Sequence, residues 1–168
     1  MLNTPEGRAW GILLTAFAIF CILIVSVPLS VRWYLLNATV SHETVLEDPI
    51  DGTVYVQDPR GTELIATTHR REDVPEGATI ATDEHLRAFL RLYEGSTLTL
   101  DYGTRIVLER VRSPRFQVGS RPNEIQIHVE QGQVAIGVGA PLERPLHMAV
   151  TTPHADIVLN EGSFAITV

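Results

Sequence analysis

The amino-acid sequence predicts one N-terminal transmembrane α-helix followed by an all-β domain. An uncharged apolar run of 23 residues extends from Ala9 to Val31. From Gly52 onward apolar and polar residues alternate with a period of two, and no amphipathic helical pattern of convincing length follows Leu36. We therefore expect a short cytoplasmic end at 1–8, a transmembrane signal anchor at 9–36, a linker at 37–51 and an extracytoplasmic β-domain at 52–168.

The apolar run is long enough to cross a hydrocarbon core of about 30 Å as a helix. Trp10 lies near one end and Trp33 just past the other, and 23 steps of 1.5 Å separate them by roughly 35 Å, as in an interfacial aromatic belt. A buried core helix is the alternative, which the length and the lack of a polar face disfavour. The run exceeds a signal-peptide core of about 7–15 residues, and no clear A-x-A cleavage site follows.

The orientation of the anchor is only weakly encoded. Arg8 precedes the run and Arg32 follows it, so the positive-inside rule nearly ties, and the free amino terminus adds a charge to the short side. We expect a single-pass protein of the cell membrane, in contact with the lipid bilayer, with its N-terminus cytoplasmic and its C-terminal domain periplasmic or otherwise extracytoplasmic.

One face of the predicted helix carries small side chains. At 100° per residue these fall within roughly 120° of arc. Small residues let a second helix approach closely in lipid, where packing drives association. Such residues are also common in membrane helices without a partner. The candidate helix-packing face consists of Gly11, Thr15, Ala18, Ser26 and Ser30.

The rest of the chain reads as short, half-buried strands separated by turn residues. An acidic or amide residue followed by glycine begins several segments, at glycines 52, 77, 95, 132 and 162. Glycine adopts positive φ without steric cost, so we expect these pairs to form tight turns between antiparallel strands. The apolar positions expected to point inward are Leu86, Ala88, Leu90, Leu92, Ile125, Ile127, Val129, Val134, Ile136, Val138, Leu146, Met148, Val150, Phe164, Ile166 and Val168.

Several of these pieces together resemble the FecR domain family. The resemblance covers about residues 52–168 and includes Glu94–Leu100, "EGSTLTL", the later "VEQGQVAI" at 129–136, and Thr152-Pro153 followed by "GSFAI" at 162–166. It implies an extracytoplasmic antiparallel β-structure, such as a β-roll, a single-sheet β-helix or a sandwich-like fold, without enzyme activity. Known members are transmembrane regulators whose cytoplasmic segment acts on a sigma factor.

Charge and motifs exclude some function classes. The 20 acidic and 13 basic residues give a net charge of −7, which argues against nucleic-acid binding. We find no catalytic, cofactor-binding or metal-binding constellation. His154 and Asp156 could share a metal with a distant third ligand, but a turn or surface role is more common for such a pair. A candidate basic cluster for docking an acidic partner or lipid head groups consists of Arg105, Arg110, Arg112, Arg115 and Arg121.

The sequence therefore favours a non-catalytic protein that acts by protein–protein contact, as an accessory or scaffolding subunit of a larger membrane complex. Its expected partners are other membrane-protein subunits, reached through the helix and the β-domain. The alternative is a FecR-like regulator that relays an outer signal in a sigma/anti-sigma pathway. Only the short end 1–8 precedes the apolar run in this sequence, which is too few residues for a folded cytoplasmic segment, so we expect the first function.

Overall fold

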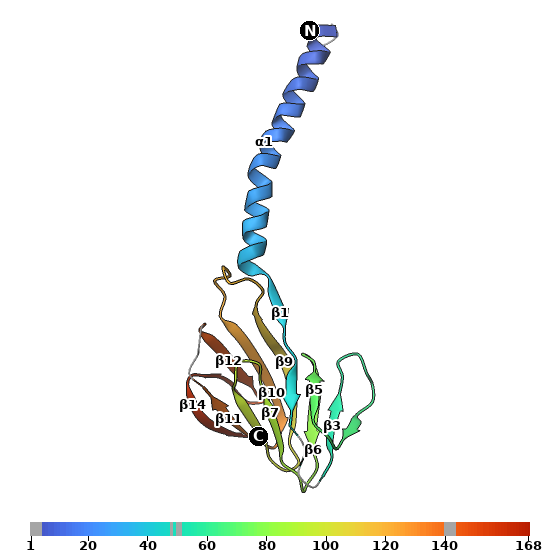
Figure 1. Ribbon diagram of the computed structural model, residues 1–168, viewed down its shortest axis with the longest axis vertical. Coiled ribbons are helices and arrows are strands. Elements are labelled where there is room, and N and C mark those ends of the chain that lie inside the picture. The colour runs from blue at the N-terminus through green and yellow to red at the C-terminus, as the bar shows by residue number, and fades with distance from the viewer. Residues whose placement is uncertain (1–4, 48, 50–51, 140–143) are drawn as a thin grey trace.

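The computed structural model describes residues 5–47, 49, 52–139 and 144–168. It begins with one long helix, α1 (Pro5–Asn37), which stands clear of a β-rich body (Figure 1). The segment Ala9–Asn37 is long and apolar enough to cross a membrane, and none of its most apolar stretch is buried inside the protein. The alternative of a buried core helix is therefore wrong.

Two sheets form the β-domain, which confirms the predicted fold class and selects its sandwich-like form over a single sheet. Among the described strand pairs, only β10 and β12 run parallel. The eight-stranded sheet has the order β13 (Asp156–Leu159), β12 (Leu146–Thr151), β10 (Asn123–Gln131), β9 (Arg105–Pro114), β6 (Thr79–Thr82), β3 (Val54–Gln57) and β4 (Ile65–Thr67), with β1 (Thr39–Ser41) also paired to β9. The six-stranded sheet has the order β14 (Gly162–Thr167), β11 (Gln133–Val138), β8 (Thr97–Leu100), β7 (Ala88–Arg91), β2 (Thr44–Leu46) and β5 (Arg71–Val74).

The hydrophobic core lies between the two sheets and follows the alternation in the sequence. In β10, Ile125, Ile127 and Val129 are fully buried, while the residues between them are partly exposed. Side chains of β-strands alternate between the two faces, so one face of each sheet supplies the core. All sixteen apolar positions expected to point inward lie in the core or pack against it.

The segment expected to be a linker, 37–51, contains two paired strands within its described residues. Residues 39–41 form β1 in the larger sheet and residues 44–46 form β2 in the smaller sheet. Thr44 and Leu46 are completely buried. Only three residues long, each strand is too short for periodicity to reveal it, and pairing with distant strands decides its conformation.

The acid-glycine pairs were expected to form hairpin turns, but most of them form connections between the two sheets. Gly77, Gly95, Gly132 and Gly162 have positive φ, as expected, but Gly52 does not. Among the four pairs of which the structure describes both residues, only Glu94-Gly95 joins two neighbouring antiparallel strands, β7 and β8. The pairs at 76–77, 131–132 and 161–162 instead carry the chain from one sheet to the other.

Candidate functional site at the helix–sandwich junction

The helix passes directly into the sandwich through strand β1. Thr39 pairs with Pro114 and Ser41 with Arg112 on β9. The amide of Arg115 donates to the carbonyl oxygen of Ala38 at 2.9 Å, and the amide of His42 donates to that of Val111 at 2.8 Å. A ladder of backbone hydrogen bonds thus holds the end of the helix at one edge of the body.

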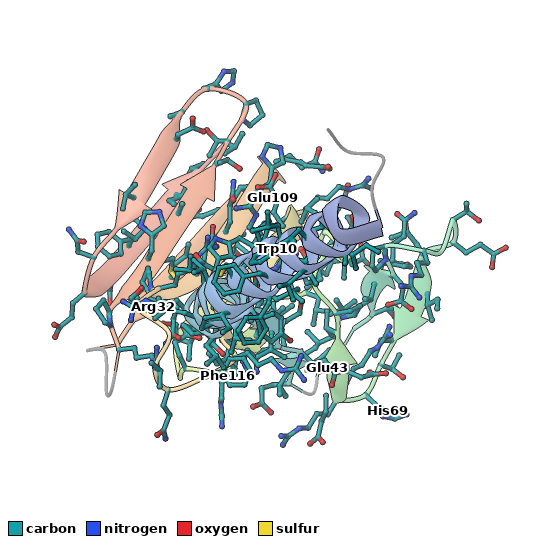
Figure 2. The ribbon with its side chains drawn as sticks, turned by 90° about the horizontal axis from the view of Figure 1, so that it is seen from above. Trp10, Arg32, Glu43, His69, Glu109 and Phe116 are labelled. Atoms are coloured by element: carbon teal, nitrogen blue, oxygen red, sulfur yellow. The ribbon has the colours of Figure 1, made fainter. Side chains whose placement is uncertain are left out.

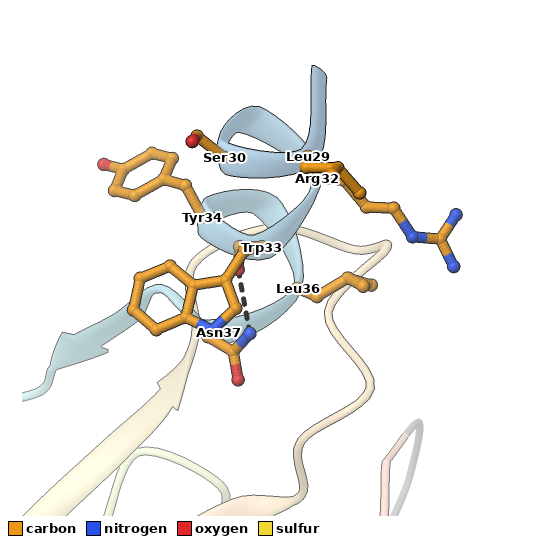
Figure 3. A pocket seen from close by; sticks show the side chains of 7 residues that line it. All are labelled: Leu29, Ser30, Arg32, Trp33, Tyr34, Leu36 and Asn37. Carbon is orange, nitrogen blue, oxygen red and sulfur yellow. Dashed lines mark hydrogen bonds between the residues drawn. The ribbon is translucent and has the colours of Figure 1, made fainter. Parts of the chain in front are cut away.

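Aromatic side chains complete the contact between helix and body. The rings of Tyr34 and Phe116 meet edge to face, with centroids 5.8 Å apart and an interplanar angle of 64°. Arg115 Nη1 donates to Tyr34 Oη at 3.3 Å. Figure 3 shows Trp33 and Tyr34 on the last turns of α1, with Arg32 pointing away from Tyr34 and Asn37 Nδ2 bonded to the Trp33 carbonyl oxygen at 2.8 Å.

An ion pair fastens β9 to the turn before β6. Arg112 Nε lies 2.9 Å from both carboxylate oxygens of Glu76, and the amide of Val111 donates to the same carboxylate at 3.3 Å. Burial opposes ionisation of Glu76, but the hydrogen bonds from Arg112 and Val111 outweigh it and lower the pKa of the carboxyl group. Because Arg112 pairs with Ser41, the ion pair also secures β1.

A second set of polar contacts, made by His42 and Tyr93, lies against strand β9. The rings of His42 and Tyr93 stack with centroids 4.1 Å apart, and His42 Nε2 lies 2.7 Å from Ser113 Oγ. Both carboxylate oxygens of Glu94 are buried nearby. Burial raises the pKa of Glu94, and the Ser96 hydroxyl, adjacent backbone amides and His42 oppose this shift without cancelling it. Burial and the charge of Glu94 also raise the pKa of Tyr93.

The raised pKa of Glu94 predicts the sign of a stability change. The folded protein holds this proton more tightly than the unfolded chain, so stability falls as pH rises above the ordinary glutamate pKa of 4.5. We expect Glu94→Gln to increase the free energy of unfolding at pH 7 by on the order of 1 kcal/mol, because a neutral amide is less costly to bury. Urea unfolding at pH 7 and pH 4 checks this; a Gln variant less stable than wild type at pH 7 contradicts it.

The loop between β9 and β10 lies at the foot of the helix (Figure 1), and we refer to residues 115–121 as the junction loop. Arg144, from the start of the β12 segment, holds it through three backbone carbonyls. Arg144 donates to the oxygens of Gln117 at 2.6 Å, Gly119 at 2.7 Å and Phe116 at 3.2 Å. Sequence analysis missed Arg144, since it lies 23 positions from Arg121 and only the parallel pairing of β10 with β12 brings it there.

The candidate helix-packing face is open to the surroundings. Thr15 Oγ1 donates to the carbonyl oxygen of Gly11 at 2.8 Å, so its hydroxyl is satisfied within the helix. Gly11, Ile12, Thr15, Ala16 and Ile19 line a shallow groove. A side chain added at Gly11 would meet no atom within 4 Å. Ala18 and Ser30 are exposed and Ser26 is partly exposed.

The candidate basic cluster is divided by the structure into separate positions. Arg105 begins β9 and Arg112 lies near its other end, roughly 20 Å away at 3.3 Å per residue. Arg105 lies 3.8 Å from Glu130 and Arg110 lies 2.8 Å from Glu124, so these charges are partnered on the strand surface. Arg115 and Arg121 belong to the junction loop. Figure 2, seen from above, shows the labelled side chains of Arg32 and of Phe116 in this loop near the projected helix α1.

Of the pair considered for metal binding, His154 lies in the β12–β13 turn and Asp156 begins β13. Thr152 Oγ1 accepts from the amide of Ala155 at 2.9 Å and orders this turn. His154 and Asp156 are both exposed. In the described residues, no three His, Cys, Asp or Glu side chains are grouped so that they could hold a metal ion.

Fold and junction together define a class of protein: an N-terminal helix that could span a membrane, joined to a β-sandwich by a paired strand. Comparison of the chain with protein-family models, with curated proteins and with solved structures found no match. The resemblance to FecR domains is therefore neither supported nor contradicted and stays a prediction.

Proposed function

We propose that this is a non-catalytic single-pass membrane protein that acts by protein–protein contact, as an accessory or scaffolding subunit of a larger membrane complex, with its sandwich on the outer face. The observation that carries the proposal is the ordered junction. Ladder hydrogen bonds between β1 and β9, the Tyr34–Phe116 contact and the Glu76–Arg112 pair all join the anchor to the body. A subunit built this way presents its sandwich at a constant height and orientation above the bilayer.

The surface of the helix is a second observation that supports the proposal. Its groove around Gly11 and Thr15 has no occupant in the described part of the chain, and a neighbouring membrane helix could pack there closely. We propose that this face contacts a helix of the complex, while the sandwich contacts the outer part of the same partner.

Replacing Gly11 with leucine tests the helix contact. We expect Gly11→Leu to reduce recovery of the partner subunits roughly tenfold, because the bulky side chain separates the two helices and removes about 1–2 kcal/mol of packing. The measurement is quantitative recovery of tagged full-length protein from membranes in mild detergent, followed by mass spectrometry of the purified complex. Ser26→Leu, on the same face, is expected to act in the same direction.

Cys21→Leu is the matched control, since it also enlarges a small side chain but lies at about 280° when Gly11 is at 0°, outside the small-residue face. It should leave recovery unchanged. Equal recovery with Gly11→Leu and wild type would remove the helix face from the proposal.

The relay function is the second candidate, and the same junction favours it, because an ordered connection can transmit a rotation or displacement of the sandwich to the helix. The identity of the recovered partners separates the two functions. A stable, stoichiometric membrane complex supports the scaffold. Recovery of a sigma factor or an outer-membrane receptor supports the relay and contradicts the scaffold.

A further inference from the structure

We infer that the junction loop binds the headgroups of anionic phospholipids in the membrane that α1 spans. This inference rests on the proposed span but not on any protein partner. The level of the loop relative to the helix is the first argument. Phe116 packs on Tyr34 and Arg115 donates to the Tyr34 hydroxyl, so the loop lies level with the aromatic residues that end the apolar run. Tyrosine and tryptophan occupy the headgroup level at the ends of membrane helices.

The chemistry of the loop fits that level. Val118, in the middle of the loop, is 71% exposed, and Trp33, which precedes Tyr34 on the helix, is 68% exposed. These apolar side chains lie where the hydrocarbon begins. The exposed valine has no contact with the hydrophobic core to explain it, and burying it in the interfacial layer would remove its apolar surface from water.

Charge specifies which lipids the loop would contact. Arg115 and Arg121 extend from the loop and Arg32 from the last turns of the helix, and the described part of the chain gives none of the three a carboxylate partner. Two other arginines near this edge are neutralised, Arg110 by Glu124 and Arg112 by Glu76, while the guanidinium of Arg144 is bonded to carbonyl oxygens of the loop. The chain as a whole carries −7, so three unneutralised cations at the bilayer surface are a local exception. Guanidinium groups pair well with phosphate oxygens.

The loop is also preorganised. Arg144 holds its carbonyls at Phe116, Gln117 and Gly119, and Gly119 is buried so closely that an added Cβ would lie 2.9 Å from Pro114 Cβ and 3.0 Å from the Phe116 oxygen. A loop already held in one conformation loses little entropy when it binds. Arg144 is thus a positioning residue, because the hydrogen bonds from its guanidinium to the loop carbonyls fix the conformation of the loop.

Depth-dependent fluorescence quenching tests the inference on the full-length chain in nanodiscs. A single tryptophan is placed in the middle of the loop by Val118→Trp in a background with Trp10→Phe and Trp33→Phe. Nanodiscs contain phosphatidylcholine alone or mixed with phosphatidylglycerol, together with a lipid that carries a nitroxide near its headgroup. We expect strong quenching in the anionic discs and weaker quenching in the neutral discs and at high salt.

Neutralising Arg115 and Arg121 with glutamine should lower the ratio of bound to free loop roughly fivefold per residue, since each basic side chain at an anionic surface contributes about 1 kcal/mol. Tyr102→Trp in the same background is the control. Tyr102 is also exposed but lies in the turn before β9, at the opposite end of that strand from the junction. It should show no quenching in either disc.

Quenching at position 118 no stronger than at position 102 would overturn the inference. Quenching that is equal in neutral and anionic discs would also overturn it, because apolar contact alone would then explain the result. Protection of Cys21 from a water-soluble maleimide in the same discs reports insertion of the helix separately. Cys21 reacting freely would show that the span itself is absent, so failure of the proposed membrane anchor and failure of the loop contact are distinguishable.

Discussion

Gly132→Ala is expected to lower the free energy of unfolding by about 2–6 kcal/mol, which is a large fraction of the total stability of a typical domain. Two costs combine. Gly132 has φ of 95°, where a residue with a Cβ is strained by about 1–3 kcal/mol. An added Cβ would also lie 2.6 Å from Thr104 Cα and 2.9 Å from Thr104 Cβ. Overpacking of this kind costs a further 1–3 kcal/mol or so.

The surroundings of Gly132 cannot relax easily. Thr104 is completely buried, and its Oγ1 accepts from the amide of Gln133 at 3.0 Å. The amide of Thr104 donates to Thr82 Oγ1 at 2.9 Å, and Thr82 Oγ1 donates to the Asp101 carbonyl oxygen at 2.7 Å. Moving Thr104 away from a new methyl group would break these bonds at the point where the chain crosses from β10 in one sheet to β11 in the other.

Gly95→Ala is the matched control for this prediction. Gly95 has a similar φ of 98°, but an added Cβ would meet no atom within 4 Å. It should therefore cost only the same backbone strain, about 1–3 kcal/mol, without the overpacking. Urea unfolding of both variants in detergent micelles, followed by circular dichroism, measures the difference. Equal losses in the two variants would contradict the close contact with Thr104.

Glu76→Gln is expected to lower the free energy of unfolding at pH 7 by about 1.5–3 kcal/mol, the usual contribution of a hydrogen bond to a charged group. The glutamine keeps the volume but cannot hold the Arg112 guanidinium as a carboxylate does. Arg112 of β9 pairs with Ser41 of β1, so losing its bond to Glu76 should first weaken the pairing of β1 with β9 at the junction. Hydrogen exchange at the amides of His42 and Arg115, both in the β1–β9 ladder, should therefore become faster.

The effect should depend on pH in a stated direction. The folded pKa of Glu76 is lowered, so the ionised carboxylate contributes its stability above the ordinary glutamate pKa of 4.5 and loses it as pH falls toward the folded value. Wild type and Glu76→Gln should then converge in stability as pH falls below the ordinary glutamate pKa of 4.5 and through the lower folded pKa of Glu76. A difference that stays constant from pH 7 to pH 3 would show that the carboxylate charge has no part in it.

Asp73→Asn is the control for the change from carboxylate to amide. Asp73 accepts from Arg71 Nε at 2.8 Å, but its side chain is 69% exposed. Exposed pairs contribute about 0–1 kcal/mol, so this variant should remain close to wild type at every pH. If Asp73→Asn lowered the free energy of unfolding as much as Glu76→Gln, the Glu76–Arg112 pair at the junction would contribute no more to stability than an exposed ion pair.

The junction also shows where prediction from sequence reaches its limit. The alternation in β10 and β11 could be recognised because each strand is long enough to display a period of two. Strands β1 and β2, three residues each, could not, and the segment was expected to be a linker. Arg112 could be listed as basic, but its partner Glu76 lies 36 positions away and only the strand order brings them together.

By itself the sequence determined the long apolar helix, the all-β character of the remainder and a part of its core, while buried residues such as Leu46, Val54 and Ile80 were not predicted. These properties depend on local patterns, namely hydrophobic length for the helix and a two-residue repeat for the strands. The tertiary structure alone decided how the strands divide between two sheets, which glycine turns cross between them, and that the helix continues into a paired strand. Those features depend on hydrogen bonds and contacts between residues far apart in the chain, which no local pattern contains.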